Sequence, residues 1–122
     1  TLESGQHFAF STRPETNYKF GNIITDALTI LSESNGNVFA ANTRSYRDQN
    51  LQLNSDNPLV FELTNDELHY SLGQSGFLTI RFNQTISTVK WNGQKVKRDS
   101  YNKNTRELNI RLPKGEGSFS FR

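Results

Sequence analysis

The sequence of 122 residues contains no cysteine and no methionine, only three prolines and one tryptophan, and no long apolar run. The absence of cysteine excludes disulfides, thiol catalysis and thiolate metal sites together. No stretch approaches the eighteen or so apolar residues that a membrane-spanning helix needs, so we expect no membrane insertion. Because the chain starts at Thr1 without a signal peptide and has no Met at all, we expect it to be processed or excised from a longer polypeptide.

Apolar content is modest, with 33% hydrophobic residues and a mean hydropathy of -0.72. Nine Phe and 11% aromatic residues nevertheless indicate a folded domain with an aromatic and β-branched core. A chain of this length forms one domain, residues 1–122. The formal charge of +2 is too small to predict a nucleic-acid partner, and we expect none.

The clearest local signal is Asn92-Gly93, which lies between two alternating runs. A type I′ hairpin turn needs positive φ at both central residues, and Asn and Gly tolerate this best. The turn predicts that Trp91 pairs with Gln94 and Lys90 with Lys95. Alternation then places side chains on two faces, a core face with Val89, Trp91 and Val96 and a solvent face with Lys90, Lys95 and Lys97.

Short alternating runs separated by Gly, Asn or Pro turns recur along the rest of the chain. They predict strands at 7–11, 18–20, 27–33, 37–41, 59–64, 67–72, 77–82, 107–112 and 118–122. Residues 23–34 also fit a helical stripe, but Asn35-Gly36 follows directly and favours a hairpin. The polar stretch 42–57 has no periodicity and is predicted to be the longest loop, with one short strand at 51–53, and residues 113–117 are predicted to be another loop.

Strands that recur at about eight to twelve residues, without βαβ alternation, are typical of all-β sandwiches and closed barrels. Inward-apolar, outward-polar alternation favours antiparallel sheets with one solvated face. We therefore predict a single antiparallel β-sandwich, immunoglobulin-like or jelly-roll, with roughly 8–10 strands.

The sequence offers little for metal or acid-base chemistry. His7 and His69 are far apart and no ligand-spaced motif exists, so we expect no transition-metal site. Calcium is left open, because Asn54, Asp56 and Asn57 supply oxygen ligands in a predicted loop. No base, nucleophile and oxyanion site can be assembled, so we expect no catalytic residues.

Two polar stretches combine arginine with tyrosine, at 13–19 and 44–48. A guanidinium binds carboxylates or sulfates bidentately, and an exposed tyrosine offers a face for sugar stacking. This chemistry suits polysaccharide recognition. The alternative is a plain polar loop in which the arginines pair with Glu15 or Asp48 and the tyrosine caps the core. The candidate glycan-binding residues are Arg13, Tyr18, Arg44, Tyr46 and Arg47.

A second candidate surface is the basic sheet face formed by Lys90, Lys95 and Lys97. Arg111 joins this face if residues 94–100 pair with residues 107–112 through the turn at 102–105. Such a face suits an acidic glycan or an acidic neighbouring domain, and it is equally typical of a soluble surface that resists edge-to-edge association.

Residues 86–122 resemble the end of β-sandwich accessory domains of bacterial polysaccharide lyases and glycoside hydrolases. The resemblance is carried by four segments, Val89-x-Trp91-Asn92-Gly93-x-x-Val96, Tyr101-Asn102-x-Asn104-Thr105, Leu112-Pro113-x-Gly115 and Phe119-x-Phe121. It implies a non-catalytic, extracytoplasmic module that binds polysaccharide or supports a catalytic domain in the same chain. The alternative is an adhesin-type β-sandwich of a cell-surface protein that contacts other proteins.

Overall fold

A computed structural model describes residues 6–10, 18–20, 23–27, 29–33, 37–97 and 99–121, with the backbone alone for residues 6–10, 18 and 20. The described residues contain strands and turns and no helix, and all strand pairs are antiparallel. No segment among them forms a helix long and apolar enough to cross a membrane. The prediction of an all-β, antiparallel protein is confirmed.

The strands follow one another along the chain with short connections. They are β1 (Gln6–Phe10), β2 (Tyr18–Phe20), β3 (Ile23–Thr25), β4 (Thr29–Glu33), β5 (Val38–Arg47), β6 (Leu51–Leu63), β7 (Glu67–Leu72), β8 (Gly76–Phe82), β9 (Val89–Trp91), β10 (Gln94–Lys95), β11 (Tyr101–Asn102), β12 (Glu107–Leu112) and β13 (Gly115–Phe121).

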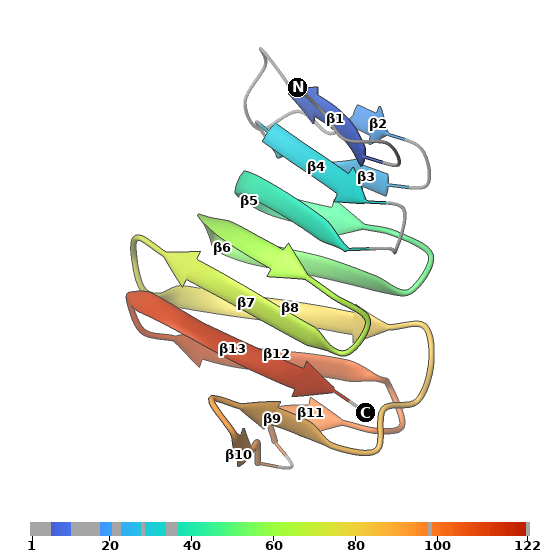
Figure 1. The fold of residues 1–122 in the computed structure, drawn as a ribbon. Helices are drawn as coiled ribbons and strands as arrows, with labels where there is room; N and C mark the ends of the chain where they lie inside the picture. Colours follow the sequence, from blue (N-terminus) through green and yellow to red (C-terminus); the bar gives the residue numbers. More distant parts are fainter. Residues whose placement is uncertain are drawn as a thin grey trace.

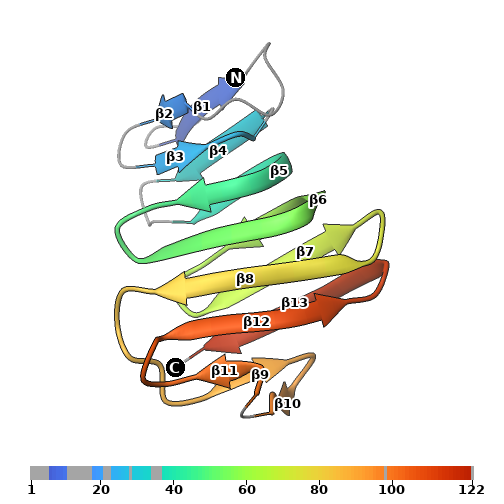
Figure 2. The ribbon, with the colours of Figure 1, turned by 180° about the vertical axis from the view of Figure 1, so that it is seen from behind.

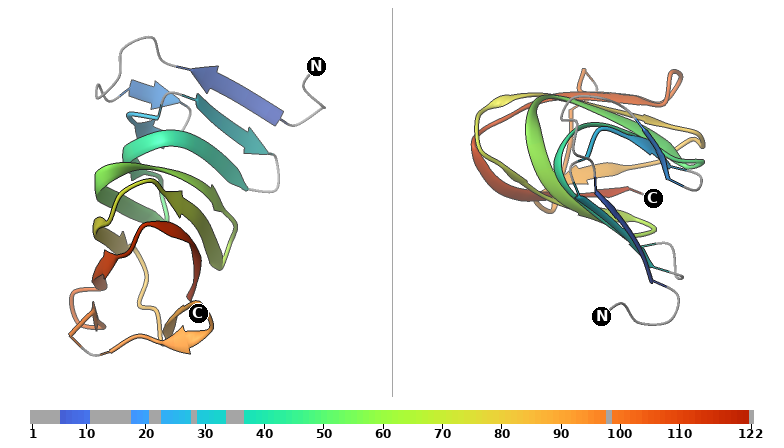
Figure 3. Two further views of the ribbon diagram at one scale, coloured as in Figure 1. Left: turned by 90° about the vertical axis from the view of Figure 1, so that its left-hand side faces the viewer. Right: turned by 90° about the horizontal axis from the view of Figure 1, so that it is seen from above.

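These strands form one sheet that curls into a half-barrel (Figures 1 and 3). The long strands β5 and β6 pass through both of its halves. The front layer has the order β1-β4-β5-β6-β7-β13-β9-β10, and the back layer has the order β2-β3-β5-β6-β8-β12-β11. A sandwich of two separate sheets is not confirmed, because the layers are joined through β5 and β6.

The bend between the layers lies in the stretch that we predicted to be a loop. The pairing of β5 with β6 shifts register between Ala40 and Thr43 and again between Thr43 and Ser45, and Asn42 has φ 54°. In β6 the pairing changes from β8, up to Ser55, to β7, from Leu59. The loop prediction for 42–57 is wrong, because bulges at the bend interrupt the two-residue period that marks a strand.

A buried carboxylate holds this bend. Asp26, only 6% exposed, lies between β3 and β4. Its Oδ1 accepts hydrogen bonds of 2.9 Å from the backbone N–H groups of Arg44 and Ser45. Its own N–H donates to the carbonyl of Ser45 at 3.1 Å. The irregular backbone is thereby satisfied internally, as a buried bend requires.

The core fills the space between the two layers. Tyr46 meets Phe61 edge-on with ring centroids 5.2 Å apart, and Phe82 contacts Phe121 at 5.1 Å. The predicted inward alternation is confirmed for the strands from 67 onward, and Ile110 is partly buried. Further large side chains of the core are Ile30, Leu53, Leu68, Leu78, Ile80, Leu108, Leu112 and Phe119.

The predicted hairpin is confirmed. Asn92 and Gly93 have φ 51° and 84°, and the register pairs Gln94 with Trp91 and Lys95 with Lys90. Residues 23–25 and 29–33 are strands rather than a helix, while the turn at Asn35-Gly36 lies outside the described residues. The loop prediction for 113–117 is partly wrong, because β13 already begins at Gly115.

The predicted pairing of residues 94–100 with 107–112 is present only at its end, where the N–H of Asn109 donates to the carbonyl of Ser100 at 2.7 Å, and it is wrong for residues 94–97. β10 pairs only with β9, and β12 pairs with β11 and with β8. The N–H groups of Ser100 and Tyr101 donate to the carbonyl of Lys97, which forms a turn. The chain therefore passes from β10 in the front layer to β11 in the back layer (Figure 1).

Candidate anion-binding site

The arginine-tyrosine segment at 44–47 belongs to β5 rather than to a loop. Tyr46 is 0% exposed, and its hydroxyl donates a hydrogen bond of 2.6 Å to Asp48 Oδ2. The expected exposed stacking face at Tyr46 is therefore wrong, because strand alternation turns this ring into the core. The alternative prediction, a tyrosine that caps the core, matches its position.

The two arginines on either side of Tyr46 in β5 are less buried than its ring. Arg47 is exposed on the outer side of the back layer, and Arg44 is half-buried at the bend. Arg13 and the side chain of Tyr18 lie outside the described residues. Glycan binding by this set stays a prediction, and within the described part only Arg47 has the exposure that it requires.

The proposed calcium ligands lie near the end of the β7–β8 connection. Asn57 Nδ2 donates to the carbonyl of Ser75 at 2.9 Å, and Asp56 Oδ2 accepts from the N–H of Phe77 at 3.2 Å. These contacts tie β6 to β8, which is a structural role. Among the described residues no group of three His, Asp or Glu side chains is placed to hold a metal ion. Calcium binding by these residues therefore stays open.

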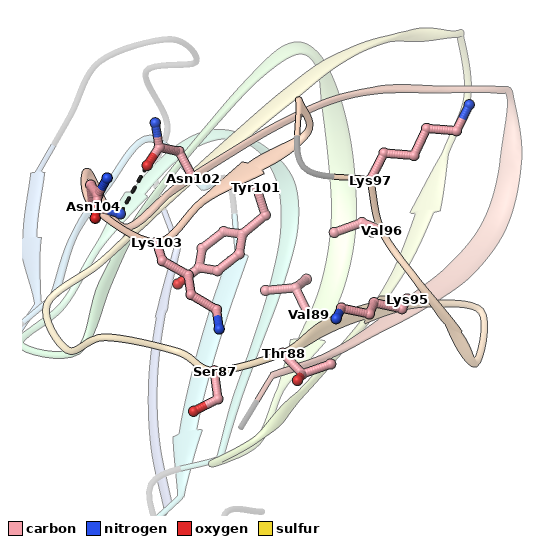
Figure 4. Close-up of a pocket in the computed structure, with 10 residues that line it drawn as sticks. All are labelled: Ser87, Thr88, Val89, Lys95, Val96, Lys97, Tyr101, Asn102, Lys103 and Asn104. Carbon is pink, nitrogen blue, oxygen red and sulfur yellow. Dashed lines mark hydrogen bonds between the residues drawn. The ribbon is translucent and has the colours of Figure 1, made fainter.

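The lysines predicted from the hairpin lie at the C-terminal end of the half-barrel. Lys95 and Lys97 line a pocket of about 450 Å³, which we call the lysine pocket (Figure 4). Lys90 lines a neighbouring hollow of about 480 Å³ together with Glu67 and Ser120. The lysine pocket is lined by Ser87, Thr88, Val89, Lys95, Val96, Lys97, Tyr101, Asn102, Lys103 and Asn104.

Three chain segments build the lysine pocket. Lys95 comes from β10, Lys103 from the turn after β11, and Ser87 from the connection between β8 and β9. In Figure 4 the ammonium groups of Lys95 and Lys103 point toward the segment 87–89, while that of Lys97 points away. Cations from different elements are thus directed toward one hydroxyl-bearing segment.

Hydrogen bonds fix the walls of this pocket. The Tyr101 hydroxyl donates to the carbonyl of Ile86 at 2.8 Å and accepts from its N–H at 3.2 Å. Asn102 Oδ1 accepts from the N–H of Asn104 at 2.8 Å, which leaves the Asn102 amide NH₂ available as a donor. The crossing connection and the turn are therefore held in place around the lysines.

The chemistry of the lysine pocket suits an anion. Its described lining includes three lysines, two of which direct their ammonium groups inward, together with two side-chain amides and two aliphatic hydroxyls, but no carboxylate. Ammonium groups attract carboxylate or sulfate, and amides and hydroxyls form hydrogen bonds with sugar hydroxyls.

Sequence reasoning found only part of this site. Lys95 and Lys97 were predicted, but Lys103 was missed, although the turn at 102–105 was recognised. Arg111 was placed wrongly, because β12 adjoins β8 and the guanidinium of Arg111 lies 5.7 Å from the ring centroid of Phe77. No pattern in the sequence indicated that the connection 83–88 carries the chain from the back layer to the front, and this crossing brings Ser87 into the site.

Comparison with known proteins adds no family. No family model matches this sequence, and no curated protein matches it. The resemblance of residues 86–122 to accessory domains of carbohydrate-active enzymes is therefore carried by strand and turn pattern alone, and the functional conclusion comes from the geometry of the site.

Proposed function

We propose that this chain is a non-catalytic accessory module of a secreted bacterial carbohydrate-active protein and that it binds acidic polysaccharide at the lysine pocket. The observation that carries the proposal is the convergence of Lys95 and Lys103, from separate segments, on a pocket whose described lining has no carboxylate. The polysaccharide resemblance of the same residues, 86–122, supports the identity of the anion as an acidic sugar.

Polysaccharide binding at the lysine pocket depends on electrostatic attraction, and each lysine adds its own contribution to the binding free energy. An exposed ammonium–carboxylate pair contributes about 0.2–1 kcal/mol, so the two lysines that point into the pocket give weak but measurable attraction to a polyanion. Salt screens exposed charges over about 10 Å at 0.1 M ionic strength. Affinity for an acidic polysaccharide should therefore fall as salt rises, and a neutral polysaccharide of similar size should bind less.

The two layers of the curled sheet face each other across one core, and we propose that they act as the two layers of a sandwich. Extracytoplasmic location follows from the same proposal, since polysaccharide lyases and hydrolases act on external polymers. The absence of cysteine does not discriminate between cell compartments.

The experiment that tests this function is a titration of the chain with pectate, dextran sulfate and neutral dextran, monitored by affinity electrophoresis. We expect retardation by the two acidic polymers and none by dextran. Lys95→Gln/Lys103→Gln should weaken binding about three- to tenfold, because two exposed ion pairs are removed.

Lys114→Gln is the matched control, since Lys114 is an exposed lysine in the β12–β13 connection, outside the lysine pocket. It removes the same charge without changing the pocket. Equal binding of dextran and pectate, or equal losses in the pocket and control variants, contradicts the proposal.

A second function, contact with another protein, is favoured by one observation. Phe39 and Val60 are 40% and 38% exposed, and both line a hollow of about 310 Å³ on the front layer. Exposed apolar groups that gather on a sheet face are typical of contact surfaces. Phe39→Ser/Val60→Ser should weaken association of the chain with a second protein copy through this face, measured by sedimentation, and leave pectate binding unchanged.

A further inference from the structure

A row of polar side chains crosses the outer face of the back layer. Strand register aligns Asn102 with Glu107, Glu107 with Arg81, Arg81 with Gln52, and Gln52 with Arg47. The same register continues through Ile24 to Lys19. We call these residues the basic row: Lys19, Arg47, Gln52, Arg81, Glu107 and Asn102. Figure 2 shows the strands that carry it, lying side by side.

Most members of the basic row are open to solvent. Lys19, Arg47, Gln52 and Arg81 are exposed, and their strand neighbours Tyr46, Leu53 and Ile80 are buried, so the row stands on the outer face. Within the part of the chain that the structure describes, neither arginine of the row takes part in an ion pair. Two guanidiniums thus face solvent without a carboxylate partner among the described residues.

The one carboxylate of the row is already engaged. Glu107 Oε1 accepts a hydrogen bond of 2.7 Å from Asn109 Nδ2, and Asn109 Oδ1 accepts from the hydroxyl of Thr79 at 2.6 Å. This side-chain network on the adjacent row orients Glu107 toward Asn109. Because a hydrogen bond to a neutral amide leaves the charge in place, Glu107 still weakens anion binding locally.

The spacing of the row follows from sheet geometry. Neighbouring strands lie about 4.8 Å apart, so Arg47 and Arg81, two strands apart, are separated by about 10 Å at the backbone. Asn102 lies four strands from Arg47, or about 19 Å. Asn102 also lines the lysine pocket, so the basic row leads directly into it.

Part of the opposite face of the molecule is acidic. The outer side of the front layer carries Glu62 and Glu116 around the apolar pair Phe39 and Val60. Electrostatic attraction therefore favours the basic row over the Phe39 and Val60 region for a polyanion, because Glu62 and Glu116 repel it there. This difference makes the placement of a polyanion along the back layer a specific expectation.

We propose that a linear acidic polysaccharide lies across the strands of the back layer along the basic row, with anionic groups at Arg47 and Arg81 and one end in the lysine pocket. This inference rests on the proposed function and deepens it, because it identifies the ligand as a chain of several acidic sugars. A guanidinium binds a carboxylate or sulfate with two parallel hydrogen bonds, which gives each position a defined geometry.

The test compares a long and a short ligand. Pectate and digalacturonate are titrated against the parent chain, Arg47→Gln/Arg81→Gln and Lys95→Gln/Lys103→Gln by calorimetry at 50 mM and 200 mM salt. Arg47→Gln/Arg81→Gln should lose about tenfold in affinity for pectate, since two exposed charge pairs are removed, and should show a weaker salt dependence. Its affinity for digalacturonate should be unchanged, because that ligand reaches the lysine pocket alone.

The matched control is Arg111→Gln. Arg111 lies on the same outer face and the same strand as Glu107, but the register pairs it with Phe77, whereas Glu107 pairs with Arg81 of the basic row. We expect this variant to bind pectate like the parent. A loss in Arg111→Gln without a loss in Arg47→Gln/Arg81→Gln overturns the proposal, because the polymer then runs along β8 and β12.

The outcomes separate the two proposals. If pectate is bound and only the lysine variant is weakened, the basic row is wrong and the lysine pocket stands. If only the arginine variant is weakened, the basic row stands and the pocket is wrong. If the parent binds neither pectate nor dextran sulfate, both proposals fail. Thermal unfolding of each variant identifies any loss that comes from misfolding.

Discussion

The indole N–H of Trp91 donates a hydrogen bond of 2.8 Å to the hydroxyl oxygen of Tyr70. Trp91 belongs to β9 and Tyr70 to β7, and β13 lies between them. Phe119 of β13 stacks on both rings, with centroid distances of 5.7 Å to Tyr70 and 6.5 Å to Trp91. This cluster anchors the β9–β10 hairpin, which carries Lys95, to strands β13 and β7 of the front layer.

Replacing either partner of this hydrogen bond should destabilise the fold. Trp91→Phe and Tyr70→Phe should each cost about 1–2 kcal/mol, because the other polar group loses its partner in a partly buried site. The double variant should cost less than the sum, with a coupling of about 0.5–1 kcal/mol. Urea unfolding of the four proteins gives the cycle, and strict additivity contradicts a direct bond.

The same aromatic cluster makes Gly117 sensitive to substitution. A Cβ at Gly117 would lie 2.7 Å from ring carbon Cζ of the buried Tyr70, whereas a Cβ at Gly73 would meet no atom within 4 Å. Gly117→Ala should therefore cost about 1–3 kcal/mol through overpacking. Gly73→Ala is the matched control and should stay within about 0.5 kcal/mol of the parent in urea unfolding. Equal stability of the two variants contradicts this packing.

Local turn chemistry and alternation predicted much of the second half of the fold. Asn92-Gly93 fixed the hairpin register, and the regular period of residues 67–72 and 107–112 identified inward side chains correctly. These features depend on neighbours in sequence. A single-sequence pattern reports them directly.

The bend and the layer crossing were not predictable in the same way. Around Thr43 the strand period is broken by bulges whose stability comes from Asp26, about twenty residues away. Lys103 and Ser87 meet only because the chain crosses between layers twice. Arg47 and Arg81 are aligned by pairing through β6. Such long-range registers have no local signal, so the sequence pointed to the residue types of the site and not to their arrangement.

Buried Tyr46 should make stability fall at high pH. Burial, followed by the charge of Asp48 and the hydrogen bond to it, raises the pKa of Tyr46 well above its ordinary value of 10.0. Below pH 10 both folded and unfolded states keep the proton, so stability does not change through this group. Above pH 10 only the unfolded state releases it, and the free energy of unfolding falls by about 1.4 kcal/mol per pH unit.

Tyr46→Phe tests this linkage, because it removes the titrating hydroxyl and keeps the ring against Phe61. Urea unfolding between pH 8 and pH 11 should show a shallower decline for the variant than for the parent above pH 10. Burial also raises the pKa of Tyr70, so some decline should remain in the variant. Parallel curves over this range contradict the assignment to Tyr46.

Asp26 should be the polar side chain at the bend on which stability depends most. Asp26→Ala leaves the N–H groups of Arg44 and Ser45 without their acceptor in a buried site, at a cost of about 2–4 kcal/mol. Asp26→Asn keeps an oxygen acceptor and should cost about half as much. Arg47 lies two residues beyond Ser45 on β5, so Asp26→Ala should weaken pectate binding more than Asp26→Asn does. Urea unfolding and calorimetry measure both effects, and an alanine variant as stable as the asparagine variant contradicts this role for the carboxylate.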